Sequence, residues 1–142
     1  MVACYTPHAH DPRTAVLLRA AALALLLPLA ACGEGGPTVP GGAARFEPPS
    51  RFRALWAETE ECAGVRRPFA AVRWYQVPDA WEVTTPDGQR VAAFYDLAAD
   101  HVVIAGAYVE SEPLIRHETL HAILDRLGHG AEFDACNLRL ED

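Results

Sequence analysis

The stretch "RHETLHAILDRLGHG", residues 116–130, holds three of the six histidines of a 142-residue chain. Pro113, just ahead of it, is typical of the first turn of a helix, and Gly128 is typical of a residue that ends one. We therefore expect one helix that ends at Gly128. Because His117 and His121 are four residues apart, that helix stacks both imidazoles on the same face.

Two imidazoles on one helix face can each offer a nitrogen to one tetrahedral cation at about 2.0–2.1 Å. Glu118 is rotated around the helix, so its carboxylate can reach a water on that cation without being a ligand. A third ligand is needed, and His129 is the first candidate. A helix that continues to Gly128 carries the chain about 10 Å past His121, so His129 returns only if the helix ends early or the chain reverses sharply. The alternative third ligands are Glu132, Asp134 and Glu141.

The pentapeptide "HETLH", residues 117–121, is an HExxH motif and resembles the metal-binding helix of zinc metallopeptidases, the zincins. The resemblance implies Zn²⁺ as the cofactor and a peptide or protein as the substrate. It also implies that Glu118 acts as the general base, taking a proton from the attacking water and passing it to the leaving amine. The chain departs from the metzincin pattern, because Leu124 and Leu127 stand where that group has its glycine and third histidine.

A wider resemblance covers residues 50–136. The pattern RHExLHxxL, a later Gly-His pair and an aromatic residue followed by cysteine are similar to those of small bacterial lipoproteins of the HExxH type. This resemblance implies a minimal zincin-like domain in which His129, the histidine after the glycine, matters for the metal.

The N-terminal third of the chain has the pattern of an export signal. Arginines precede the apolar run "AAALALLLPLA", which is too short for a stable membrane span, so residues 1–31 are expected to be a signal peptide. The sequence Leu-Ala-Ala-Cys that ends at Cys32 resembles a lipobox, which implies that Cys32 carries lipid. Residues 32–49 are rich in Gly and Pro and are typical of a tether, which leaves residues 50–142 as the domain. We therefore expect a lipid-anchored protein of the cell envelope, facing the periplasm or the exterior.

Two cysteines, Cys62 and Cys136, remain in the expected domain. In an oxidising compartment such a pair predicts a disulfide, which would help to stabilise so small a core. The chain has 19 Asp and Glu against 12 Lys and Arg, a net charge of −7. This balance argues against nucleic acid as a partner.

The remaining patterns predict an α+β domain with an N-terminal helix, a small antiparallel-containing sheet and the C-terminal metal-binding helix. Ser50 and Gly64 suit the two ends of the first helix. β-Forming runs at residues 69–77, 91–97 and 101–109 predict strands, and their short connections favour antiparallel pairing. Tyr95 and Tyr108 lie in these strands, where packing of the ring is favoured over donation to an oxyanion. His101 opens the last strand and is expected to be a surface or structural residue.

Two further interpretations compete with the zinc peptidase. The first is a metal-binding lipoprotein without catalysis, and the second is a protein-binding module in which the motif is accidental. Glu118 favours catalysis over a structural metal, because a structural site has no need of a carboxylate beside its first ligand.

Overall fold

The computed structural model of the chain describes residues 39–140. The expected signal peptide of residues 1–31, the predicted lipid attachment at Cys32 and the alternative ligand Glu141 lie outside these residues. None of the helices within residues 39–140 is long and apolar enough to cross a membrane.

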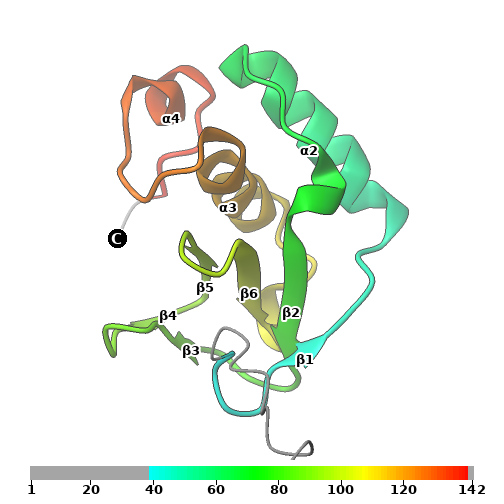
Figure 1. Ribbon diagram of the computed structural model, residues 1–142, viewed down its shortest axis with the longest axis vertical. Coiled ribbons are helices and arrows are strands. Elements are labelled where there is room, and N and C mark those ends of the chain that lie inside the picture. Colours follow the sequence, from blue (N-terminus) through cyan, green and yellow to red (C-terminus); the bar gives the residue numbers. More distant parts are fainter. Residues whose placement is uncertain (1–38, 141–142) are drawn as a thin grey trace, which may run out of the picture. The chain divides into compact units, whose positions relative to one another are not determined.

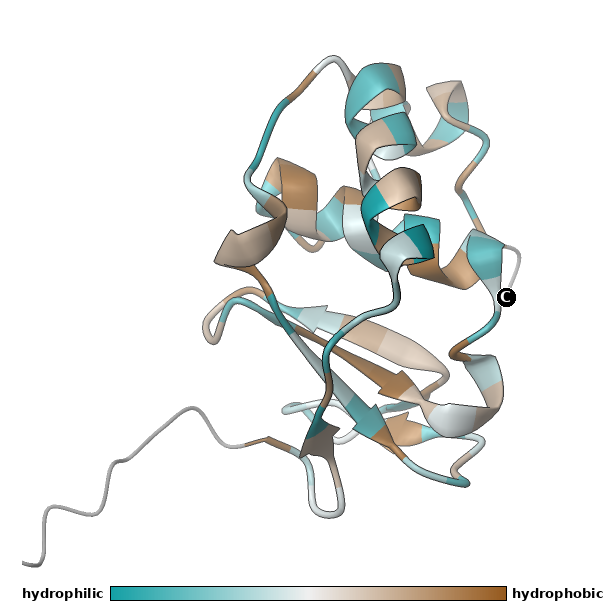
Figure 2. Cartoon of the chain, turned by 90° about the vertical axis from the view of Figure 1, so that its right-hand side faces the viewer, coloured by the Kyte–Doolittle hydropathy of each residue, from teal (hydrophilic) through white to brown (hydrophobic). Residues whose placement is uncertain are grey.

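The described chain forms two layers, with helices on one side and a four-stranded sheet on the other (Figures 1 and 2). This arrangement confirms the expected α+β class. In spatial order the strands are β1 (Ala44–Arg45), β2 (Arg73–Val77), β6 (His101–Ala105) and β5 (Ala93–Asp96). The helices are α2 (Ser50–Ala63), α3 (Glu112–Leu124) and α4 (Ala131–Ala135), with short 3₁₀ turns at Phe69–Ala71 and Gly106–Tyr108.

The pairing in the sheet is mixed rather than antiparallel throughout. Central strand β6 pairs with β5 in antiparallel fashion, but it runs parallel to β2. The expectation of antiparallel neighbours was wrong for this pair. After β2 the chain forms a separate hairpin of β3 (Val83–Thr84) and β4 (Arg90–Val91) and then β5, and this long connection allows β6 to run in the direction of β2.

Alternating side chains of β6 contribute to two cores because neighbouring residues point to opposite faces of a sheet. Val102 and Ile104 pack in the main core between the sheet and the helices, with Phe52 of α2 and Ile115 of α3. Val103 and Ala105 belong to a smaller cluster with Val83 of the hairpin and Phe94 of β5. Every residue of β6 is buried, as expected for a strand covered on both faces.

Helix α2 begins and ends close to the predicted residues. Gly64 adopts a left-handed conformation with φ of 66°, which ends the helix as predicted. Ser50 is the first helical residue and makes no side-chain cap, because the N-cap position is taken by Pro49. The folded part starts before residue 50, since Ala44–Arg45 pairs with β2 and the ring of Phe46 packs against Phe52 at 6.1 Å.

Candidate metal centre

Helix α3 carries two of the predicted ligands on its buried side. His117 and His121 lie one turn apart, and each side chain is almost fully enclosed. Pro113 lies in the first turn, where a main-chain N–H would have no partner within the helix, so the lack of an N–H in proline costs no hydrogen bond. The helix therefore presents the pair of imidazoles in the way that the spacing predicts.

The helix ends four residues earlier than Gly128, and this corrects the predicted end. It stops at Leu124, and Asp125 adopts a left-handed conformation with φ of 52° and ψ of 48°. The N–H of Arg126 then bonds to the carbonyl of His121 at 3.2 Å, which turns the chain back toward the helix. Because the helix ends early and the chain reverses here, His129 can lie close to His117 and His121.

The structure brings His117, His121 and His129 together in one cluster. The three Nε2 atoms form a triangle with each side measuring 3.1 Å. Three nitrogens bound to one tetrahedral zinc at 2.0–2.1 Å would be about 3.3 Å apart. The cluster therefore has the spacing of three ligands around a single small cation.

The hydrogen bonds of the two helical histidines fix their tautomers. Nδ1 of His117 lies 2.7 Å from the carbonyl oxygen of Leu138, and Nδ1 of His121 lies 3.0 Å from that of Arg126. A carbonyl only accepts, so both Nδ1 atoms carry the proton and both Nε2 atoms present a lone pair. Two lone pairs that face each other are repulsive, and a cation between them removes that repulsion. Donation of the second ring nitrogen to a backbone carbonyl is also typical of histidines that bind metals.

Burial keeps the two helical imidazoles neutral, as metal ligands must be. Desolvation lowers the pKa of His117 below its ordinary value, and it lowers the pKa of His121 to about 4, although hydrogen bonds to the backbone oppose both shifts. The lone pairs are therefore available at neutral pH without competition from protons.

A single aromatic ring supports all three imidazoles from one side. Phe133 of α4 is fully buried, and its ring centroid lies 5.2, 4.6 and 4.8 Å from those of His117, His121 and His129. In the sequence, Phe133 stands out only as the aromatic residue before Cys136 in the family pattern. Neither this residue nor the carbonyl of Leu138 carries a local sequence signal that would have assigned it to the site.

The carboxylate alternatives for the third ligand are engaged elsewhere. Glu132 forms an ion pair with Arg126, and Asp134 pairs with Arg139 at 2.7 Å. Arg139 also donates to the carbonyl of His129 at 3.4 Å, so this pair helps to fix the loop that carries the histidine. Of the three described candidates, only His129 faces the other two histidines.

Glu118 is buried beside the cluster, with a side chain that is only 4% exposed. Burial raises the pKa of its carboxyl to about 8, while a hydrogen bond from the main-chain N–H of Tyr95 opposes the shift. The side chain makes no ion pair among the described residues. A carboxyl with this pKa is poised near the neutral range in which general acids and bases work.

A cleft of about 780 Å³ opens onto the histidines and Glu118. One wall is the edge strand β5, and another is the tip of the β3–β4 hairpin, which includes Pro86. Leu97 and Leu127 also line the cleft, with 42% and 58% of their surface exposed. The described lining residues include no arginine, so apart from any bound cation the cleft is apolar with a few acidic groups.

The outer edge of β5 offers free main-chain groups to this cleft. The N–H of Ala105 in β6 donates to the carbonyl of Ala92 at 2.9 Å. Because bonded and non-bonded pairs alternate along an antiparallel ladder, Ala93 and Tyr95 direct their N–H and C=O away from β6.

The other sequence candidates lie away from the histidines. The hydroxyl of Tyr95 lies 3.0 Å from Asp100 and 2.8 Å from Asp125, so it does not face the metal cluster. Tyr108 packs edge-to-face with Trp81 at 6.1 Å. His101 is fully buried, with burial lowering its pKa, so the surface alternative for this residue was wrong.

The predicted disulfide between Cys62 and Cys136 is present. It joins the last turn of α2 to the residue that follows α4, close to the fully buried Phe133. The carbonyl that holds His117 belongs to Leu138, two residues beyond the bridge. The covalent link therefore restrains the tail that orients one ligand.

Comparison with protein-family models, with curated proteins and with solved structures finds no match to this chain.

Proposed function

We propose that this protein is a zinc-dependent peptidase, anchored by lipid to the cell envelope, that cleaves a peptide bond with water. The observation that carries the proposal is that three imidazole nitrogens face one another in a cleft that the buried residue Glu118 also lines. Three protein ligands leave a fourth tetrahedral position to water or substrate, which is typical of catalytic rather than structural zinc.

Zinc held by His117, His121 and His129 would supply Lewis-acid chemistry, polarising the scissile carbonyl and acidifying a water. In this proposal Glu118, which lines the cleft and has a pKa near neutrality, performs the proton transfers. A divalent cation nearby favours the ionised carboxylate, which can take a proton from the attacking water. The protonated carboxyl can then donate that proton to the nitrogen of the leaving amine.

The edge of β5 supports an extended peptide as the substrate. A peptide lying along this edge could pair with the outward N–H and C=O of Ala93 and so add a strand to the sheet. Side chains of the peptide would then contact the exposed parts of Leu97 and Leu127. We therefore propose substrates with apolar residues near the cleaved bond.

The envelope location rests on the sequence pattern of residues 1–49 and is supported by the chemistry of the domain. A disulfide between Cys62 and Cys136 suits an oxidising compartment outside the cytoplasm. Incorporation of labelled fatty acid into the wild type, and its loss in Cys32→Ser, would test the lipid anchor.

The first experiment is elemental analysis of zinc per chain in the wild type, in His129→Ala and in the control Glu132→Gln. We expect near-stoichiometric zinc in the wild type and in the control, because Glu132 pairs with Arg126 instead of facing the cluster. His129→Ala should lose most of the zinc. Equal zinc in all three proteins would remove His129 from the ligand set.

The second experiment measures hydrolysis of a peptide library by the wild type and by Glu118→Gln. The glutamine variant should bind zinc and lose nearly all activity, since general base catalysis contributes about 10²–10⁴-fold in rate. Stoichiometric zinc without hydrolysis of any peptide would favour the non-catalytic metal-binding lipoprotein. A wild type that binds no zinc would leave the protein-binding module.

A further inference from the structure

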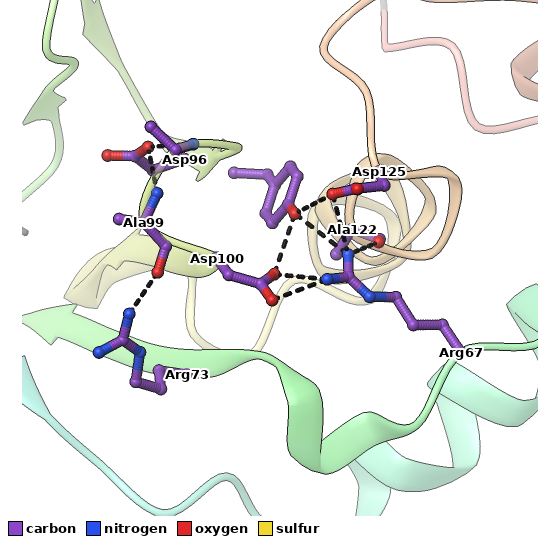
Figure 3. A network of polar contacts seen from close by, with 9 residues as sticks. Arg67, Arg73, Asp96, Ala99, Asp100, Ala122 and Asp125 are labelled. Atoms are coloured by element: carbon purple, nitrogen blue, oxygen red, sulfur yellow. Dashed lines mark hydrogen bonds and ion pairs between the residues drawn. The ribbon is translucent and has the colours of Figure 1, made fainter.

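A cluster of four polar side chains joins four segments of the chain at the end of α3, the helix that carries His117 and His121 (Figure 3). We name it the Arg67 cluster, and its members are Arg67, Tyr95, Asp100 and Asp125. Arg67 follows α2, Tyr95 lies in β5, Asp100 lies in the turn before β6, and Asp125 ends α3. The cluster therefore connects the end of α3 to the segment after α2 and to the sheet strands β5 and β6.

Arg67 provides the only positive charge of this cluster and contacts every other member. Its guanidinium donates to both carboxylate oxygens of Asp100 at 2.8 and 2.7 Å, and it lies 3.3 Å from Oδ1 of Asp125. It also donates to the Tyr95 hydroxyl at 3.1 Å and to the carbonyl of Ala122 in the last turn of α3. The planar fork of arginine suits such a set of diverging acceptors.

The Tyr95 hydroxyl bridges the two carboxylates. It lies 2.8 Å from Oδ1 of Asp125 and 3.0 Å from Oδ1 of Asp100. Burial raises the pKa of this phenol, so the hydroxyl keeps its proton and can donate it to one of the two carboxylates.

The main chain of Arg67 is held by α2 from both sides. Its N–H donates to Glu60 at 2.7 Å, and its carbonyl accepts from the indole N–H of Trp56 at 2.9 Å. The guanidinium therefore projects from a fixed backbone toward the end of α3.

The residue that the cluster holds is the one that turns the chain toward the metal site. Asp125 is left-handed, a conformation that is unfavourable for a residue other than glycine and needs support from its surroundings. The next carbonyl, that of Arg126, accepts from Nδ1 of His121, and His129 follows in the same loop. The hydrogen bond that orients His121 and the position of His129 thus both depend on the direction that the chain takes at Asp125.

We propose that Arg67 and Tyr95 are positioning residues of the metal centre. They hold the left-handed turn at Asp125, and this turn sets both the orientation of His121 and the approach of His129. The inference rests on the metal site of the proposed function, and it adds two residues whose side chains bond to one another and to the end of α3, not to the three histidines.

The test compares the full chain with its variants Tyr95→Phe and Arg67→Lys, and with Tyr75→Phe as the matched control. Tyr95→Phe removes one hydroxyl and leaves the ring in the core. Arg67→Lys keeps the charge and removes the fork. The hydroxyl of Tyr75, in the same sheet, makes no hydrogen bond within residues 39–140, so its loss should leave the metal site unchanged. Zinc affinity is measured by competition with a chelator, ligand geometry by the visible spectrum after cobalt substitution, and stability by urea unfolding of the metal-free proteins.

We expect the zinc dissociation constant to rise about 10-fold or more in both variants, because groups that orient ligands typically contribute 10–100-fold to metal affinity. The cobalt spectrum should change as well, while Tyr75→Phe matches the wild type in both measurements. If the variants lose stability but keep the wild-type zinc affinity and cobalt spectrum, the cluster is merely structural and the inference is wrong while the metal site stands. If the wild type itself binds neither metal, the inference and the proposed function both fail.

Discussion

Replacing Glu118 by glutamine should stabilise the metal-free protein by an amount that grows with pH. Glutamine has nearly the same shape but never ionises. Burial raises the pKa of the folded carboxyl to about 8, whereas the ordinary value of 4.5 applies in the unfolded chain. The wild type therefore holds a buried acid that resists losing its proton, and the variant does not.

The sign of the effect follows from the two pKa values. Below pH 4.5 both the folded and the unfolded wild type keep the proton, and the free energy of unfolding does not depend on Glu118 ionisation. Between pH 4.5 and about 8 only the unfolded chain loses it, so the free energy of unfolding falls as pH rises. Above about pH 8 the fall stops, because both states are ionised. Since one pKa unit corresponds to about 1.4 kcal/mol, the loss reaches up to about 3 kcal/mol at neutral pH.

The assay is urea unfolding of both proteins with chelator present and the disulfide intact, at about pH 5 and about pH 8. The lowered pKa values of His117 and His121 are common to both proteins, so their contribution largely cancels in the difference between variant and wild type. We expect Glu118→Gln to gain stability relative to the wild type on going to the higher pH. The same difference at both pH values would refute the reasoning, because it would mean that Glu118 ionises in the folded protein at an ordinary pKa.

Two further changes test the supports of the site. Replacing Cys62 and Cys136 by serine should lower the free energy of unfolding by about 4 kcal/mol, as expected for a bridge that closes a loop of 74 residues, and urea unfolding at fixed pH measures it. Unchanged stability in the double variant would show that the tail is held by packing alone. Phe133→Ala should lower the free energy of unfolding by about 3–5 kcal/mol and also weaken zinc binding, since the ring packs against all three imidazoles. Calorimetry with and without zinc separates the two effects, and a variant with wild-type zinc affinity would contradict the supporting role of the ring.

The facing pair His117 and His121 on α3 could be predicted because the relation between the two residues is local. A separation of four residues on a helix places two side chains on one face, whatever the rest of the fold does. The disulfide was also predictable, because Cys62 and Cys136 are the only cysteines of the expected domain.

The end of α3 was not predictable from neighbouring residues. Gly128 carries the usual local signal, but the chain turns at Asp125, where a carboxylate gains contacts with Arg67 and Tyr95 from distant segments. Tertiary contacts outweigh local preference here, and the position of His129 depends on them. The parallel pairing of β2 with β6 is another non-local choice, since a hairpin and strand β5 intervene between them.

The three histidines lie close together in the sequence, whereas the two cysteines of the disulfide lie 74 residues apart. All three histidines lie between residues 117 and 129, so an unfolded chain needs to close only short loops to gather them around zinc. The unfolded chain would therefore also bind zinc weakly. Because binding to the unfolded state offsets binding to the folded state, zinc would raise the free energy of unfolding by less than its affinity for the folded site alone predicts. The disulfide spans 74 residues and restricts the unfolded ensemble whether or not metal is present. The domain should consequently stay folded after chelation and take up zinc again without refolding.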